Sequence, residues 1–134
     1  MTYKRQTGVL ILIIFAATSG LCFGQGTIWN GPDTLFRKTN NTDWTLEVNQ
    51  DRITSNVWLT RKSTRGIFNI KTENAYVSTS PDDTEWSDGT TDDIAGLTFT
   101  SWFNWHDKNP PGKVNVNAVL HLIKENIYID IKFT

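Results

Sequence analysis

The chain has 134 residues, of which 13 are basic and 14 acidic, for a net charge of −1, and it contains one cysteine. This near-neutral balance argues against a nucleic-acid-binding protein, whose affinity depends on clustered Lys and Arg side chains. A single cysteine cannot form a disulfide within the chain.

The first 24 residues have the layout of a secretory signal peptide. Lys4 and Arg5 form a basic head, residues 8–17 are almost wholly apolar, and small and polar residues follow. The apolar run is too short for a membrane-spanning helix, which needs about 20 residues. We therefore expect residues 1–24 to be a signal peptide that is cleaved after Gly24.

Cleavage would change both the charge and the redox chemistry of the chain. Residues 25–134 carry eleven basic and fourteen acidic side chains, a net charge of −3, and no cysteine. They would have no disulfide, no thiolate nucleophile and no cysteine-ligated zinc. A lipoprotein anchored through Cys22 is the alternative, which the bulky Leu21 before that cysteine disfavours. The sequence predicts a secreted protein, extracellular or at the cell surface, with no membrane span after signal removal.

Residues 25–134 are expected to form one all-β domain, since about 110 residues suffice for a single core. Threonine and asparagine are abundant, and short β-rich runs alternate with turn signals such as KTNNTD, SPDD and KNPPGK. We predict a single antiparallel β-sandwich of jelly-roll type. The expected strands cover residues 27–29, 34–38, 56–61, 66–71, 75–78, 96–101, 117–124 and 127–133.

The last two of these strands are expected to form a hairpin. Residues 127–133 alternate between apolar and polar side chains, which is typical of a half-buried antiparallel strand. A connecting loop with an even number of residues keeps the apolar faces of both strands together. We predict the two-residue loop 125–126, which places Leu122 opposite Ile129.

The same register would place His121 opposite Asp130 on the second face of the sheet. We interpret this pair as a structural contact between opposite charges, contributing roughly 0.2–1 kcal/mol. The alternative is part of a catalytic dyad or a pH-sensitive contact. A dyad needs a nucleophile within reach, and the sequence contains no GxSxG motif.

An acidic stretch, PDDTEWSDGTTDD, is the candidate calcium site. Calcium takes six to eight oxygen ligands and is often bound by extracellular loops. The spacing is not that of an EF-hand, so a solvated loop is the simpler interpretation, with calcium kept as the alternative. A glycosidase pair is disfavoured because its carboxylates must face each other across a cleft. We expect no other cofactor. The candidate ligands are Asp82, Asp83, Glu85, Asp88, Asp92 and Asp93.

A cluster of aromatic residues, SWFNWH, contains the candidate ligand-binding residues Trp102, Trp105 and His106. Exposed tryptophan rings can stack on sugars, but six tryptophans in a domain of this size must mostly be buried. We favour a core role for most of these rings, with one at a loop rim. A histidine metal site needs further ligands, and the chain has only two histidines. We therefore expect His106 to be an exposed loop residue rather than a metal ligand.

Seven segments along residues 27–134 carry a resemblance to a known domain. They are TIWNGP, NQDRITSNVWLTR, RGIFNI, SPDDTEW, GLTFTSW, NPPG and NAVLHLIKENIYIDIKFT. In this order they resemble a recurrent, uncharacterised extracellular β domain of large secreted bacterial proteins. The resemblance implies secretion and a compact β domain, and it carries no site residues. Similar sequences run on past the equivalent of IYIDIKFT, so this chain is either a minimal form or lacks a final strand, whose absence would expose a sheet edge to another chain.

These observations together predict a secreted, non-catalytic binding or adhesion module. Carbohydrate is the favoured ligand class, because of the aromatic and Asn/Asp-rich loops, and another surface protein is the other partner considered. The first alternative is a structural spacer of the cell envelope or extracellular matrix. The second is a small hydrolase built around His121, His106 or the acidic stretch, for which the residues lack a supporting arrangement. The step from fold to function is associational, since sandwich folds host many activities.

Overall fold

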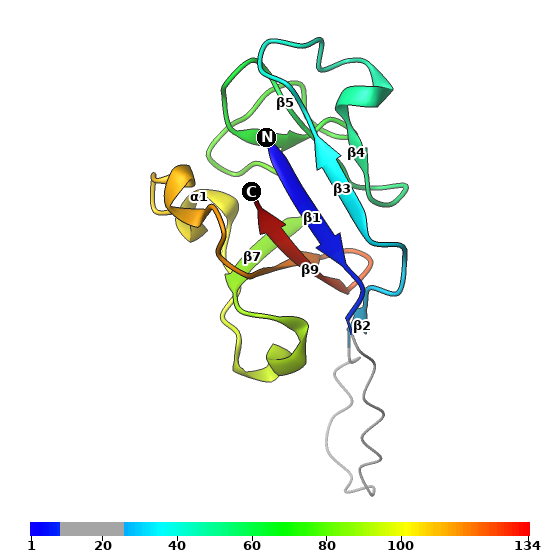
Figure 1. The fold of residues 1–134 in the computed structure, drawn as a ribbon, viewed down its shortest axis with the longest axis vertical. Coiled ribbons are helices and arrows are strands. Elements are labelled where there is room, and N and C mark those ends of the chain that lie inside the picture. The colour runs from blue at the N-terminus through cyan, green and yellow to red at the C-terminus, as the bar shows by residue number, and fades with distance from the viewer. Residues whose placement is uncertain (9–25) are drawn as a thin grey trace, which may run out of the picture.

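The computed structural model describes residues 1–8 and 26–134, whose strands form two sheets (Figure 1). Strands predominate and the helical segments are short, so the predicted all-β class is confirmed. Within these two described ranges, the structure contains no helix of sufficient length and apolar character to cross a membrane.

The larger sheet has six strands. Its order is β3-β1-β9-β8-β7, with antiparallel neighbours throughout, and β2 pairs in parallel with the start of β9. The strands are β1 (Thr2–Gln6), β2 (Thr27–Ile28), β3 (Thr34–Arg37), β7 (Thr84–Asp88), β8 (Ala118–Leu122) and β9 (Ile127–Phe133).

The smaller sheet is antiparallel, in the order β4-β5-β6. Its strands are β4 (Asp51–Arg52), β5 (Trp58–Arg61) and β6 (Ile67–Asn69). The helical turns are η1 (Glu47–Asn49), η2 (Thr91–Gly96), α1 (Trp102–Trp105) and η3 (Pro110–Lys113).

Both sheets contribute to one hydrophobic core. Leu59 and Ile67 enter it from the smaller sheet, and Leu120 and Ile129 enter it from the larger one. Each of these side chains is almost fully buried, which stabilises the fold by roughly 1.5–3 kcal/mol per residue. The jelly-roll sandwich arrangement of the two sheets stays a prediction.

The hairpin of β8 and β9 has the predicted faces but not the predicted register. Leu122 lies opposite Ile127, because the connecting loop covers the four residues 123–126 rather than two. Asn126 ends this loop with a φ of +53°, a conformation that Asn tolerates better than most residues. The shift of two positions leaves every side chain on its predicted face.

The other predicted strands agree with the structure unevenly. Residues 75–78 form no strand, and of residues 96–101 only Thr100 pairs, through a bridge to Trp86. β7 lies within the acidic stretch that the sequence analysis treated as a loop. Thr84 and Trp86 of this strand are buried and Glu85 between them is half-buried, which follows the two-residue alternation of a strand, whereas Ser87 is buried as well.

β1 occupies the interior of the larger sheet, between β3 and β9 (Figure 1). Tyr3 lies opposite Phe36 on one side and Phe133 on the other. These residues belong to the predicted signal peptide, and in the intact chain they form a sheet strand. Most of the predicted apolar run, Cys22 and the expected cut after Gly24 lie outside the described residues.

A buried ion pair joins β1 to the smaller sheet. Arg5 donates two hydrogen bonds to Asp51, each 3.0 Å long, and both side chains are about 5% exposed. The Tyr3 hydroxyl donates a third bond to the same carboxylate, at 2.6 Å. Burial, followed by the charge of Asp51, raises the pKa of Tyr3 well above its usual value, so its hydroxyl remains a donor.

Candidate functional site

The two predicted ligand-binding tryptophans lie together on α1 and face the core. Ser101 caps this helix by accepting a hydrogen bond from the backbone N–H of Asn104. The Trp102 and Trp105 ring centroids lie 4.9 and 5.6 Å from that of Trp86, and the two side chains are only 5% and 6% exposed. Both rings are therefore part of the core rather than an exposed sugar platform.

His106 follows α1 and is buried, so its expected position in an exposed loop is wrong. Its ring lies 5.1 Å from the ring of Trp102 and 6.0 Å from that of Phe103. Burial is the main cause that lowers the pKa of His106, with Lys113 adding to the effect and Asp107 opposing it. The neutral imidazole is thus the form that the fold favours.

The lowered pKa of His106 predicts a loss of stability in mild acid. The His106 imidazole binds a proton more readily in the unfolded chain than in the folded one. The stability that the buried neutral ring contributes is therefore complete above about pH 6.5 and is lost as the pH falls below that value. We expect His106→Phe, which keeps a ring beside Trp102, to weaken the fall in unfolding free energy between about pH 7.5 and pH 5. Urea titrations at both pH values measure this difference. Equal falls in the two proteins would contradict the prediction.

The acidic candidates for a calcium site are spread over the turn before β7, β7 itself and η2 after it. Glu85 pairs with His121 at 2.7 Å, and Asp88 pairs with Lys113 at 2.8 Å. In residues 1–8 and 26–134, no three His, Cys, Asp or Glu side chains form a group that could hold a metal ion. The other acidic residues of the stretch are the buried Asp83 and the exposed Asp82, Asp92 and Asp93.

The predicted pair of His121 and Asp130 is wrong, because the register of the hairpin is shifted. His121 lies opposite Tyr128, and their rings stack with centroids 4.1 Å apart and planes 6° apart. Asp130 accepts hydrogen bonds from the backbone and the hydroxyl of Thr91, at 2.7 and 2.9 Å. Asp130 therefore anchors the turn after β7.

His121 has structural partners on both ring nitrogens. Nδ1 lies 2.7 Å from Glu85 Oε1, and Nε2 lies 3.0 Å from Asn126 Oδ1. The Phe99 ring packs against the imidazole at 5.7 Å. Neither hydrogen-bonding partner is a hydroxyl or thiol nucleophile, so this arrangement resembles a structural contact more than a hydrolase site.

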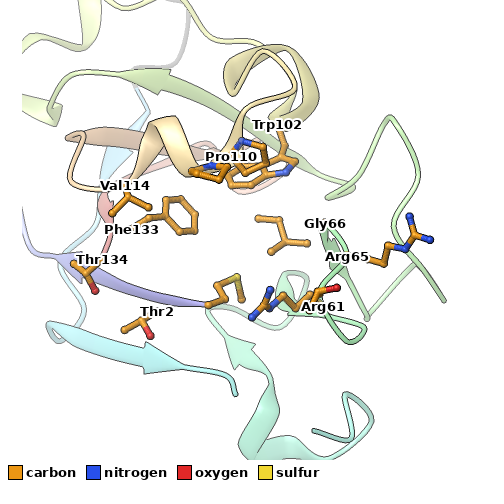
Figure 2. A pocket seen from close by; sticks show the side chains of 13 residues that line it. Thr2, Arg61, Arg65, Gly66, Trp102, Pro110, Val114, Phe133 and Thr134 are labelled. Carbon is orange, nitrogen blue, oxygen red and sulfur yellow. The ribbon is translucent and has the colours of Figure 1, made fainter. Parts of the chain in front are cut away.

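An open pocket of about 420 Å³ lies where β1, β9, the β5–β6 turn and the segment after α1 meet (Figure 2). Arg61 and Arg65 stand on one side of it, across from Val114 and Phe133. Its size is within the range of small-ligand sites, roughly 300–1,000 Å³. The apolar side chains in its lining include Ile67, Trp102, Pro110, Pro111, Val114 and Phe133.

The charged side chains that line this pocket are those of Arg61 and Arg65. The buried Nε of Arg61 has no hydrogen-bond partner in the described part of the chain, although Nη2 donates to Asn40. Met1 also lines the site, and its amino group donates to the Lys38 carbonyl at 2.9 Å. Burial, then Arg61 and Lys38, lowers the pKa of that amino group.

Comparisons with known proteins leave this pocket unassigned. Neither known protein families nor curated proteins nor solved structures give a match to the chain. The resemblance to an extracellular bacterial domain stays a prediction.

Proposed function

We propose that this chain is a secreted, non-catalytic binding or adhesion module that holds an acidic carbohydrate in the pocket. The observation that carries the proposal is the combination of an apolar wall with a rim whose charged side chains are both cationic. The apolar wall suits the flat C–H face of a sugar ring. Arginine suits a carboxylate or sulfate group, because its planar guanidinium can donate two parallel hydrogen bonds.

Each part of the pocket has a role in this proposal. Pro110 and Pro111 provide rigid apolar surface at low entropic cost, and Val114 extends that surface. Arg65 is exposed at the rim and meets the acidic group of the ligand first. Arg61 is half-buried beside it and supplies a second positive charge to the lining. Removal of the predicted leader would take Met1 and Thr2 out of the lining, whereas the other lining residues belong to residues 61–134.

A glycan array that contains matched neutral and acidic sugars tests the proposal. We expect the full chain to bind acidic glycans, and Arg65→Gln to weaken that binding about tenfold, the effect of losing one charge-assisted hydrogen bond. Lys71→Gln is the control, because this cation lies outside the pocket lining. Binding should be equal with calcium and with EDTA. Equal binding of neutral and acidic glycans, or equal losses in both variants, would contradict the proposal.

A structural spacer is the second candidate. It is favoured by the burial of Trp86, Trp102 and Trp105, since a sugar-binding module often keeps such rings on its surface. A spacer would bind no glycan in either buffer, and Arg65→Gln would then change nothing that the array measures.

A further inference from the structure

The position of β1 is unusual, because the strand lies inside the sheet while its sequence lies inside the predicted leader. Thr2–Arg5 of β1 pair with β3, and Tyr3–Gln6 of the same strand pair with β9. Among the described residues, β3 pairs with no strand other than β1. Removal of the leader would therefore open a slot one strand wide between β3 and β9, with unpaired backbone groups on both sides.

The inner wall of this slot selects specific side chains. Tyr3 packs between Phe36 and Phe133, with ring centroids 5.5 and 5.4 Å away. Arg5 and the Tyr3 hydroxyl together give the Asp51 carboxylate three hydrogen bonds. An occupant of the slot thus needs an aromatic residue and, two positions later, an arginine on the same face of the strand.

An empty slot would be unstable. Asp51 is 5% exposed, and the three bonds from β1 are the side-chain hydrogen bonds that its carboxylate accepts within the described residues. A buried carboxylate without partners is strongly unfavourable. The slot would also expose Phe36 and Phe133 to water. These costs favour refilling by another strand, as in complexes where an extended peptide adds to a sheet.

We propose that, once the leader is removed, the slot between β3 and β9 accepts a β-strand of a partner polypeptide. The partner strand runs antiparallel to both neighbours and carries the pattern aromatic-x-Arg. The central residue points outward, where Lys4 lies opposite Lys132 in the intact chain. Lys4 also pairs with Asp33 at 3.8 Å, so charges of both signs border this position and it does not select one charge. The inference rests on leader removal and concerns a protein partner, independently of the sugar proposed for the pocket.

Strand exchange in the intact protein tests this inference. A protease site inserted between residues 9 and 25 of the full chain is cut after folding, so residues 1–8 stay bound without a covalent link. A fluorescent peptide, MTYKRQTG, is then added at a urea concentration that keeps the fold, and its incorporation is followed by anisotropy. Circular dichroism in parallel reports whether the fold is retained.

We expect the peptide to replace the cut segment while the fold persists. Versions with Tyr3→Ala or Arg5→Gln should bind at least about tenfold more weakly than the unchanged peptide. Gln6→Ala is the matched control, because this exposed side chain lies outside the slot. The Asp51→Asn chain should no longer distinguish the Arg5 peptide from its Arg5→Gln version.

Three results would overturn the inference. The first is the absence of exchange below the urea concentration of unfolding. The second is equal incorporation of all the peptides, including a scrambled one. The third is a chain that retains Met1 after secretion, found by mass spectrometry, since the slot would then stay filled by its own strand. None of these results depends on glycan binding, so the pocket proposal is judged separately.

Discussion

Asp51→Asn is expected to lower the unfolding free energy of the full chain by about 3–5 kcal/mol, because it leaves the Arg5 guanidinium buried without a counter-charge. The neutral amide keeps the size of the carboxylate, so the effect isolates charge from packing. One oxygen acceptor is also replaced by an N–H donor that faces the donors of Arg5 and Tyr3. Urea unfolding followed by circular dichroism measures the loss.

Glu47→Gln is the matched control for this substitution. Glu47 also pairs with an arginine, Arg52, at 3.0 Å, but its side chain is 74% exposed. An exposed pair of this kind contributes about 0–1 kcal/mol, because water and salt screen it. If Asp51→Asn destabilised the chain no more than Glu47→Gln, the buried ion pair between β1 and the smaller sheet would contribute no more to the unfolding free energy than an exposed pair does.

Trp86→Ala is expected to destabilise the chain by about 3–5 kcal/mol, the cost of a large cavity in a core. Trp86 is fully buried and lies within 6.1 Å, between ring centroids, of three other aromatic rings. Its indole N–H also donates to the Thr84 hydroxyl at 3.1 Å. The substitution removes the ring that the others surround, so the near-ultraviolet circular dichroism of the aromatic cluster should weaken as well.

Two other substitutions serve as comparisons for Trp86→Ala. Trp86→Phe keeps a ring in the same place and should cost less, since most of the volume remains filled. Val48→Ala removes methyl groups from a side chain that is 75% exposed, and it should change the stability little. A similar loss in Trp86→Ala and Val48→Ala would show that the cluster is not the centre of the core.

The hairpin of β8 and β9 shows how far the sequence determines the fold. Apolar alternation fixes which face of β9 is buried, and the structure agrees over residues 127–133. Alternation has a period of two, so it cannot distinguish a two-residue loop from the four-residue loop 123–126. The loop length depends on tertiary contacts that the hairpin sequence does not contain. One of them is the hydrogen bond from the Ile123 N–H to the carbonyl of Asp83, which lies in a distant part of the chain.

The strands that sequence analysis missed carry charged or polar residues in their interior. β7 contains Glu85 and Asp88 among its five residues, and it was interpreted as part of a loop. β1 contains Lys4 and Arg5, which are typical of a leader. The charged side chains of both strands have partners far along the chain. Glu85 pairs with His121, and Arg5 pairs with Asp51. Such pairing becomes visible only when the tertiary structure brings the partners together.

The candidate site was predictable only in part. A core role for Trp102 and Trp105 followed from the number of tryptophans, and the structure places both rings there. The pocket itself was missed, because its lining comes from both ends of the chain and from two separate turns. The basic residues within 61–65 were the signal available in the sequence, and Arg61 and Arg65 of that group reach the rim.

The pairing of Tyr3 with Phe133 sets the timing of folding. It joins positions about 130 residues apart, so the loop that closes between them is nearly as long as the chain. Contacts over such separations form late and slowly. During synthesis β1 leaves the ribosome first, and it can pair with β3 as soon as residues 34–37 follow, but the edge that faces β9 stays unpaired until the end of the chain is made. β1 therefore becomes an interior strand of the sheet only after the last residues of the chain have been synthesised.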